Sequence, residues 1–546
     1  MVTESTCPSQ VVVVGYGPVG QVLSHLLARN GHRTTVVEKW PRPYPLPRAV
    51  SFDGHAGRIL AGTGVSDALA PHCRPSPDYE IDTADGRTLL RIPLAARGRH
   101  GWPDSTSVYQ PGLEAALAER NARLDALRLL RGWEAVDVAD CGDEGARVTA
   151  RDAATGELRT FRGAFVVGCD GAGSLVRRSL GTPMTDRGFE LDWMACDVVP
   201  HRPADFPPRR NLQIADPARP RVVVPAGPGH RRWEFMRLPA EPYEEFATLA
   251  NAWRMLEACG VSRDAAELQR HAVYRLGARN AVRWRAGNLL IAGDAAHQMP
   301  PFVGQGMCSG IRDAANLAWK LDLVLAGKAG GALLDSYGRE RRPQVQGVVD
   351  MSVRLGRLIC ETDPHAAARR DEAMLAARAA DTAGPSTEDD SAEDDPSRDA
   401  LTGGFLRLGA DGRPSAPAGR LAPQARVAAA GRSGLLDDVV GRGFVLLTRD
   451  DPAELLHSDL LRSLALLGVR PVWLRPAGTG DGAAVVDVDG RYLRWLSGLN
   501  AVAVLVRPDF YLYGAGRDAA DTEAMLGGFL QQLAPAPAAS GAAPAH

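Results

Sequence analysis

Short apolar runs that lead directly into glycine are the clearest pattern along the chain. Val11–Val14, Phe165–Val167 and Asn288–Ala292 are such runs. Apolar runs of this length, bounded by turn residues, are typical of strands buried on both faces of a parallel sheet. We therefore predict an α/β fold with a buried strand at each of these three places.

The turn after the first run has the spacing G-x-G-x-x-G. In this motif Gly15 permits the tight turn, Gly17 lets the backbone approach a pyrophosphate, and Gly20 lets the next helix pack against the strand. That helix is expected over Pro18–Asn30 and directs its N-terminal N–H groups at phosphates. The motif therefore predicts a dinucleotide-binding site.

A second strand, Arg33–Val37, is expected to end at Glu38, eighteen residues after Gly20. An acidic residue at about this distance binds ribose hydroxyls. The same negative charge would repel a 2′-phosphate. The ligand of this site is therefore predicted to be FAD or NAD and not NADP.

The third run ends in Gly293-Asp294 and leads into a loop rich in proline and glycine. Because ligands of open α/β sheets bind at the carboxyl ends of strands, Asp294 is expected to hydrogen-bond a ribityl or ribose hydroxyl. Pro301 stiffens the loop, while its glycines let backbone N–H groups approach a flat ring. A helix is expected to start near Gly310, with its positive end toward that ring.

The second run ends in Asp170-Gly171, and Ser174 follows. Taken alone, this pattern indicates an ordinary turn from strand to helix, with Asp170 as the N-cap. A role in ligand binding depends on the other two motifs.

Between and beyond these motifs, the alternation of apolar and polar residues predicts further elements. A helix over Tyr243–Ala258 would bury Phe246, Leu249, Trp253 and Leu256 on one face, and a long helical region is expected over Leu333–Arg370. Antiparallel strands that would shield a substrate are expected at Asp78–Pro93, Asp192–Val199, Asn211–Ile214, Arg221–Val224 and Arg232–Arg237. A small α/β unit closes the chain, with strands at Phe444–Leu447, Val469–Leu474 and Ala501–Val506 and a final helix over Ala519–Leu533.

Composition narrows the class of protein. The 546 residues carry 63 basic and 65 acidic side chains, so no overall positive field suggests a nucleic-acid partner. No apolar run reaches the roughly eighteen residues of a membrane span. The eight cysteines form no C-x-x-C pair, so neither a metal site nor a redox dithiol is indicated, and a cytoplasmic location is expected.

These motifs, in this order, resemble the group A flavoprotein aromatic hydroxylases, which are single-component FAD monooxygenases. The segment MPPFVGQGMCSGIRDAANLAWKL, Met299–Leu321, is most similar to 3-(3-hydroxyphenyl)propionate hydroxylases and to polyketide-tailoring hydroxylases, although many relatives have Asn in place of Cys308. The resemblance is strong over Val11–Arg342 and weak elsewhere. It implies a Rossmann-like FAD-binding domain interrupted by an antiparallel-sheet substrate domain, with long helices and a C-terminal thioredoxin-like domain.

The resemblance also implies a domain order. The FAD-binding domain would take residues 1–75, 111–182 and 281–375, the last with the helical region, and the substrate domain 76–110 and 183–280. A flexible linker would take 376–430, the thioredoxin-like domain 431–535 and a disordered tail 536–546. A homodimer is a possible assembly.

Site residues follow from the resemblance position by position. Arg48 matches an arginine near the flavin and pyrophosphate, and Gln110 a polar residue that contacts FAD from a helix start. Asp170 matches an aspartate that serves FAD and nicotinamide binding. The full expected FAD set is Gly15, Gly17, Pro18, Gly20, Glu38, Arg48, Gln110, Asp170, Gly293, Asp294, Pro301, Gly304, Gly306 and Met307. Alternatively, Arg48 is a surface arginine and Gln110 a helix-start residue without a ligand.

The chemistry implied is hydroxylation of a phenolic or polyketide aromatic ring with O₂, through a flavin C4a-hydroperoxide. NADH or NADPH would bind transiently as the electron donor. Tyr274 is the candidate that polarises the phenol, with a tyrosine merely packed on a strand as the alternative, and Pro301 lies in the loop beside the flavin ring. An arginine for a substrate carboxylate cannot be selected among Arg209, Arg210, Arg231 and Arg232. Two alternative hypotheses are Baeyer–Villiger or epoxidising chemistry on the same scaffold, and a non-catalytic flavin-binding protein.

Overall fold

A computed structural model describes residues 3–4, 9–44, 48–203, 206, 210–382, 400–478 and 484–534. The chain divides into two compact units. The first unit comprises residues 1–25, 34–312 and 345–395, and the second unit residues 26–33, 313–344 and 396–546. Residues 383–399 of the predicted linker and the whole of the predicted tail, 536–546, lie outside the described residues.

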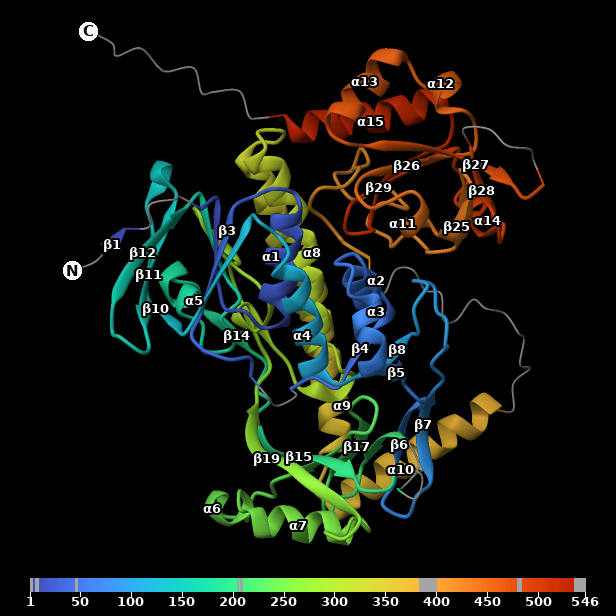
Figure 1. Cartoon of the computed structure of the whole chain (residues 1–546). Helices are drawn as coiled ribbons and strands as arrows, with labels where there is room; N and C mark the ends of the chain where they lie inside the picture. Colours follow the sequence, from blue (N-terminus) through green and yellow to red (C-terminus); the bar gives the residue numbers. More distant parts are fainter. Residues whose placement is uncertain are drawn as a thin grey trace. The chain divides into compact units, whose positions relative to one another are not determined.

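The first unit contains a six-stranded sheet that brings the three apolar runs together (Figure 1). Its order is β21 (Arg285–Ala286), β22 (Leu289–Ile291), β13 (Phe165–Gly168), β2 (Val11–Val14), β3 (Thr34–Glu38) and β9 (Leu127–Arg131). All pairings are parallel except that of β21 with β22. Because β22, β13 and β2 are neighbours and parallel, the turns that follow them emerge at the same edge of the sheet.

A second sheet forms the other large layer of the first unit. Its seven strands run in the order β19 (Ala266–Leu276), β15 (Leu191–Pro200), β18 (Arg231–Met236), β17 (Arg221–Pro225), β16 (Asn211–Ile214), β6 (Tyr79–Asp82) and β7 (Thr88–Ile92). Strand β6 comes from far upstream and pairs with β16 in parallel. The predicted antiparallel strands therefore gather into one sheet, while most of β19, the longest of its strands, was not anticipated.

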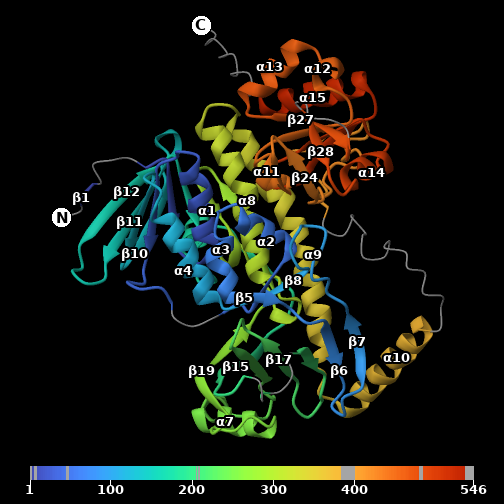
Figure 2. The same ribbon diagram turned by 45° about the vertical axis from the view of Figure 1, so that its right-hand side comes forward.

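Alternate residues of β15 and β18 point to opposite faces of this sheet. Met194, Cys196, Trp233 and Phe235 pack with Trp253 and other side chains of α6 (Tyr243–Phe246) and α7 (Leu249–Ala258) in one apolar cluster. The helices cover this outer face, as both views show (Figure 2). The inner face carries the intervening residues.

Smaller elements complete the first unit. Strands β1 (Thr3–Glu4), β12 (Leu158–Gly163), β11 (Ala146–Asp152) and β10 (Trp133–Asp140) form a four-stranded sheet. Helix α1 (Pro18–Arg29) follows β2, helix α4 (Gln110–Asn121) precedes β9, and helix α5 (Leu175–Leu180) follows β13.

The second unit is built on a seven-stranded mixed sheet. Its order is β25 (Arg432–Leu435), β24 (Arg426–Ala429), β28 (Val485–Asp487), β27 (Arg470–Pro476), β26 (Val445–Thr448), β29 (Ala503–Val506) and β30 (Leu512–Gly516). Helices α13 (Ser458–Leu466) and α15 (Ala519–Leu533) pack on one face, and α11 (Leu436–Val439) and α14 (Arg491–Gly498) on the other (Figure 1). The sequence predicted the central strands and final helix but missed β24, β25 and β28.

A buried charge cluster ties helices to this sheet inside the second unit. Glu340, on α9 (Asp335–Ile359), accepts from Lys320 Nζ at 2.8 Å and from Arg507 Nη2 at 2.7 Å. Lys320 lies on α8 (Gly306–Leu325), and Arg507 also pairs with Asp509 at 2.6 Å. Lys320, Glu340 and Arg507 have side chains that are 0% exposed. Such a cluster holds only while every partner is present, because an unpaired buried charge is strongly destabilising.

Several predicted boundaries were wrong. The helix expected over Tyr243–Ala258 breaks into α6 and α7 because Thr248 has an extended backbone and caps α7, and Leu249 is consequently exposed. The long helical region divides into α9 and α10 (Pro364–Thr382). Residues 400–430 are packed in part, since Leu401 and Phe405 are buried.

Candidate active site

The turns after β2 and β22 and the start of α8 pack closely against one another. A Cβ atom on Gly310 would lie 2.5 Å from Val19 Cγ2 and 3.1 Å from Gly293 Cα, so only glycine fits there. Helix α8 begins at Gly306, about one turn earlier than the predicted start near Gly310. The small side chains thus let three chain segments, distant in sequence, meet at the edge of the six-stranded sheet.

The glycines of the N-terminal motif differ in their surroundings. Gly15 has φ +98°, and a Cβ there would lie 2.4 Å from the carbonyl oxygen of Cys169. A Cβ on Gly20 would lie 2.1 Å from the carbonyl oxygen of Gly15. A Cβ on Gly17 would meet no atom within 4 Å. Gly15 and Gly20 are therefore required by packing, whereas Gly17 faces open space beside Pro18 at the N-terminus of α1, where a phosphate can approach.

Glu38 lies at the end of β3, as predicted, and is buried. Its Oε2 accepts from the backbone N–H of Tyr16 at 2.7 Å, and its Oε1 accepts from that of Trp40 at 2.8 Å. These two bonds fix the carboxylate next to the glycine turn. Each carboxylate oxygen retains a second lone pair for a hydroxyl donor.

Gln110 is buried at the first turn of α4 and connects this turn to the segment that carries Arg48. Its Oε1 accepts from the N–H groups of Arg48 at 2.8 Å and of Ala49 at 2.5 Å, and its Nε2 donates to Glu114 Oε1 at 2.7 Å. The Arg48 guanidinium lies 4.8 Å from the centre of the Tyr44 ring. Burial raises the pKa of Glu114, while Gln110 and the charge of Arg48 oppose that shift.

Asp170 follows β13 and is held by the start of α5. Its Oδ2 accepts from the N–H groups of Leu175 at 2.7 Å and Val176 at 3.2 Å, while Ser174 is the N-cap residue. Its Oδ1 is buried and has no hydrogen-bond partner among the residues that the structure describes. An unpaired buried carboxylate oxygen is costly unless a ligand donates to it. The N-cap of α5 is therefore Ser174, and the prediction of Asp170 as the N-cap was wrong, although one of its oxygens accepts from the first turn of that helix.

The remaining predicted residues lie in the exposed loop between β22 and α8. Asp294 is exposed in a single 3-10 turn, Gly293–Ala295, and Pro301 is exposed at the start of another. Gly304 has φ +63°, and a Cβ on Gly306 would have only Met299 Cγ at 3.9 Å. Met307 is half-buried in the first turn of α8. The backbone of this loop is therefore accessible to a planar ring.

The residues at this edge fit FAD. The open space at Gly17 suits a pyrophosphate, Glu38 lies where a ribose hydroxyl is bound, and the unpaired Oδ1 of Asp170 offers an acceptor. Gly306 leaves room beside the loop of Pro301, whereas a Cβ on Gly304 would lie 3.3 Å from Ser51 Oγ.

The inner face of the seven-stranded sheet lies against the loops of this site. The Trp193 and Phe302 rings are in edge contact, with centroids 5.6 Å apart, and Phe302 follows Pro301. Arg232 Nη1 donates to the carbonyl oxygen of Arg48 at 2.6 Å. Tyr274, on β19, pairs directly with Trp193 in the sheet register and so shares its face. The two predicted parts of the site, flavin loop and candidate tyrosine, therefore flank the same region.

The Tyr274 hydroxyl donates to Glu234 Oε2 at 2.6 Å. Burial and the adjacent carboxylate of Glu234 raise the pKa of Tyr274 well above 10.0. Burial also raises the pKa of Glu234, although the charge of Arg232 opposes it. Tyr274 is therefore a neutral hydroxyl group that both donates and accepts, and not a stored phenolate.

Glu234 and its charged neighbours were not selected from the sequence. Arg232 pairs with Asp197 at 2.7 Å and approaches Glu234 at 3.6 Å. The available signal was a two-residue alternation of charged residues within the otherwise apolar run of β18. Of the other arginines considered, Arg210 pairs with Glu80 and Asp82, Arg231 is buried and donates to the His230 carbonyl, and Arg209 lies outside the described residues.

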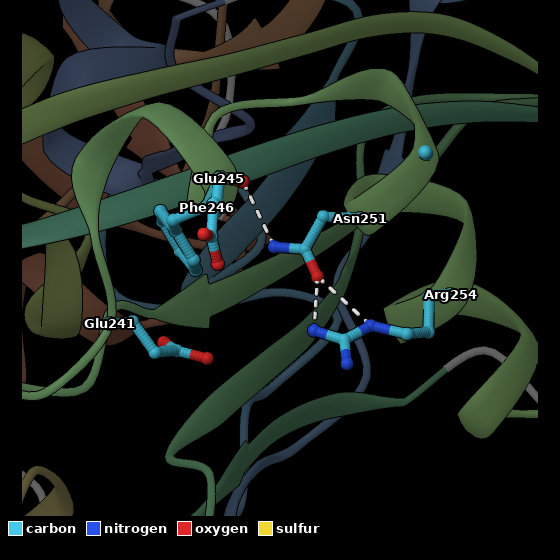
Figure 3. Close-up of a pocket in the computed structure, with 6 residues that line it drawn as sticks. Glu241, Glu245, Phe246, Asn251 and Arg254 are labelled. Atoms are coloured by element: carbon cyan, nitrogen blue, oxygen red, sulfur yellow. Dashed lines mark hydrogen bonds between the residues drawn. The ribbon is translucent and has the colours of Figure 1, made fainter.

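A separate pocket of about 290 Å³ lies on the outer side, where α6 and α7 begin (Figure 3). Asn251 lines it and accepts from Arg254 Nε at 3.1 Å, while its Nδ2 donates to the Phe246 carbonyl at 3.0 Å. Glu241, Glu245 and Ala250 complete the lining. None of the predicted site residues belongs to it.

Known proteins resemble the chain over nearly its whole length. Residues 8–352 match the family model described as FAD binding domain, and residues 419–532 match that described as HcaD C-terminal domain. A Rhodococcus jostii (strain RHA1) protein named "Probable NADH-specific resorcinol 4-hydroxylase" is 36% identical over 532 residues, which are 96% of each chain. A 3-(3-hydroxy-phenyl)propionate/3-hydroxycinnamic acid hydroxylase of Mycobacterium sp. (strain JLS) is 34% identical over 518 residues, or 93% of this chain and 89% of that protein.

Solved structures show the same fold. The structure of aklavinone-11 hydroxylase with FAD and aklavinone aligns with a TM-score of 0.76 at 25% identity, and covers 97% of this chain and 99% of that one. The flavin-dependent monooxygenase PieE, with FAD and substrate, aligns with a TM-score of 0.78 at 23% identity over 96% and 100% of the two chains. Within the described residues, no helix is long and apolar enough to cross a membrane. The shared motifs, the family match and these relatives establish that the chain belongs to the family of FAD-dependent aromatic hydroxylases.

Proposed function

We propose that this enzyme hydroxylates a small phenol at a ring carbon, with NADH as the electron donor and O₂ as the source of the oxygen atom. The single observation that carries the phenol is the Tyr274 hydroxyl, held at 2.6 Å from Glu234 on the sheet face that meets the flavin loop. The name of the Rhodococcus relative supports NADH and a dihydroxybenzene substrate. Glu38 beside the glycine turn supports an FAD adenosine moiety at this end of the site.

The FAD-binding residues are proposed from their positions. The pyrophosphate would be accommodated by Gly15, Gly17, Pro18 and Gly20, and a ribose would be bound by Glu38. Gln110 and Arg48 would bind the part of FAD that adjoins them. Asp170, with its unpaired Oδ1, and Gly293-Asp294 would bind from the neighbouring turns. The loop of Pro301, Gly304, Gly306 and Met307 would border the ring. When bound, FAD supplies the capacity to take electrons from the nicotinamide and to activate O₂.

The protein's own contribution is orientation and the exclusion of water. Tyr274 accepts a hydrogen bond from the substrate hydroxyl, which raises electron density in the ring and directs its orientation. The buried rings of Trp193, Phe302 and Phe189 form an aromatic wall, with Phe189 and Phe302 centroids 6.0 Å apart. Such a wall keeps water from the reacting atoms, which protects oxygen transfer from wasteful release of H₂O₂.

The direct test is to supply ¹⁸O₂ and a panel of phenols, dihydroxybenzenes and phenolic acids to the yellow, FAD-containing protein. We expect NADH consumption to rise with a dihydroxybenzene and one ¹⁸O atom to appear on a ring carbon of the product. Ring-expanded or epoxide products would favour the Baeyer–Villiger or epoxidising alternatives. Absence of any phenol-stimulated NADH consumption would refute the proposal.

We also infer that the second unit contains a thioredoxin-like fold. The strand order β27-β26-β29-β30, with β26 and β27 parallel and the last two antiparallel, supports it. Helices α13 and α15 follow β26 and β30 and pack on the same face. The last cysteine in the sequence is Cys360, so this unit has no dithiol, and a packing role is the proposal.

A further inference from the structure

Five polar side chains form one cluster, held by hydrogen bonds and longer ion pairs, on the inner face of the substrate sheet. Asp197 comes from β15, Arg232 and Glu234 from β18, and Arg270 and Tyr274 from β19. Asp197, Arg232 and Glu234 have side chains that are 4%, 4% and 8% exposed. Polar groups this deeply buried on a sheet face that borders a catalytic loop call for a chemical explanation.

The two carboxylates of the cluster, Asp197 and Glu234, differ in how closely the arginines approach them. Asp197 forms close contacts with Arg232, at 2.7 Å and 3.1 Å, and lies 3.8 Å from Arg270. Glu234 lies 3.6 Å from Arg232, beyond hydrogen-bond distance, and its one close side-chain partner among the described residues is Tyr274 at 2.6 Å. Both arginine charges thus centre on Asp197. Glu234 is left as the carboxylate with the greater capacity to take a proton.

We propose that Glu234 is the proton acceptor for the substrate phenol and that it acts through Tyr274. The inference rests on the proposed function, in which the substrate hydroxyl binds at Tyr274. In this step the substrate O–H bond breaks and its proton passes to the Tyr274 oxygen. The original Tyr274 O–H bond breaks as its proton passes to Glu234 Oε2. The substrate becomes the phenolate, Glu234 becomes a neutral acid, Tyr274 ends as it began, and no atom changes oxidation state.

The burial of Glu234 favours this direction. Burial raises the pKa of Glu234 above 4.5, so it is a stronger base than an exposed carboxylate. Asp197 raises this pKa further, whereas Arg232, Tyr274 and Arg270 lower it. Tyr274 is too weak an acid to hold the negative charge itself, which makes it a conduit.

Glu234→Gln is the first variant, because glutamine keeps an oxygen that accepts from Tyr274 but cannot take the proton. We expect kcat with an unactivated phenol to fall by about 100-fold, the lower range for loss of a general base. Fluorinated phenols that are already ionised at the assay pH should restore most of the rate. A merely structural role would lower the rate for all phenols alike. Glu234→Asp should recover part of the loss.

The dependence of wild-type kcat on pH, at the low-pH end, provides a second kinetic readout. Because the acceptor must be unprotonated, wild-type kcat should rise with pH through the pKa of Glu234. In Glu234→Gln this rise should disappear, and the rate should follow ionisation of the phenol itself. The matched control is Glu267→Gln, which makes the same change on β19 at an exposed position. It should behave as wild type.

Infrared difference spectra test the transfer without turnover. When 4-nitrophenol is added to the oxidised, FAD-containing protein at a pH below the pKa of this phenol, so that it enters the site with its proton, a protonated-carboxyl band should appear. It should be absent in Glu234→Gln and in Tyr274→Phe, and absent in wild type when 4-nitroanisole, which has no proton to give, is added. The inference would be overturned if the band persisted in Glu234→Gln, or if this variant lost the same fraction of kcat with neutral and with ionised phenols. In either case, hydroxylation by the wild type would still support the proposed function. If Glu234→Gln does not retain FAD, the inference is tested by the spectra of the wild type, where the band should appear, and of Tyr274→Phe, where it should be absent.

Discussion

Gly15 and Gly17 are two residues apart, yet their substitution should have different consequences. Alanine at 15 would need φ +98° and would clash with the Cys169 carbonyl oxygen, whereas alanine at 17 meets no protein atom. We expect Gly15→Ala to destabilise the apoprotein by about 1–3 kcal/mol, the cost of a strained backbone position. Gly17→Ala should leave apoprotein stability within about 0.5 kcal/mol of wild type but weaken FAD binding by about tenfold or more.

Thermal denaturation of the apoprotein and flavin fluorescence titration measure the two effects separately. A Gly17→Ala protein with unchanged FAD affinity would contradict the assignment of the open space to a pyrophosphate. These glycines could be predicted from sequence because the spacing of the motif is local, although the clash at Gly15 comes from Cys169, after the neighbouring strand β13. The Tyr274–Glu234 bond could not, because it joins strands that are 40 residues apart and depends on their register.

Helix α7 shows how one local feature can shift an amphipathic pattern. Periodicity predicted a continuous helix that buried Leu249, but Thr248 interrupts it, and its Oγ1 accepts from the Asn251 N–H at 3.2 Å. Because α7 starts again at Leu249, the side chain of Leu249 is 50% exposed, while Trp253 and Leu256 stay buried. Strand β19 was missed because polar residues lie on both of its faces and a register shift interrupts its pairing with β15, so it shows no regular two-residue period. Propensity alone cannot reveal such tertiary effects.

The cap at Thr248 provides a test of this boundary. Thr248→Ala removes the acceptor for the Asn251 N–H and should destabilise the protein by about 1 kcal/mol. Thr248→Ser keeps a hydroxyl acceptor and is the matched control. Urea denaturation followed by tryptophan fluorescence measures both, since Trp253 lies on this helix. Equal stability of the two variants would indicate that the helix passes through residue 248 without a break.

Within the second unit, the fold depends on charges as well as on an apolar core. Lys320, Glu340 and Arg507 are brought together from two helices and a strand end, and each lies far from the others in sequence. Burial raises the pKa of Glu340, but the charges of Arg507 and Lys320 outweigh burial and lower it below 4.5. Burial lowers the pKa of Lys320 to about 8, although Glu340 opposes this shift. Sequence patterns predicted the helices but contained no sign of this cluster.

Glu340→Gln should destabilise the protein by about 3–5 kcal/mol, because it leaves Lys320 and Arg507 buried without their shared partner. Folded Glu340 resists protonation, whereas in the unfolded chain it takes a proton near pH 4.5, so wild-type stability should fall as the pH drops below that value. The variant should lack this part of the acid dependence. Denaturation at several pH values, with the exposed Glu454→Gln as the control, measures both effects. An acid dependence identical to that of wild type would assign the sensitivity to other carboxylates.

The cluster behind Tyr274 has a consequence for the choice of substrate. Its two cations, Arg232 and Arg270, are equal in number to its two carboxylates, Asp197 and Glu234, although both arginines pair with Asp197. A phenolic acid would bring a third anion to a site whose counter-ions are already occupied, and would lose its own hydration on entering. The enzyme would then discriminate against charged rings because the cluster already contains as many carboxylates as cations. This discrimination requires no steric barrier. A resorcinol-sized neutral ring should therefore be used with a KM at least about tenfold lower than its carboxylated analogue, in line with roughly 1.4 kcal/mol of uncompensated charge.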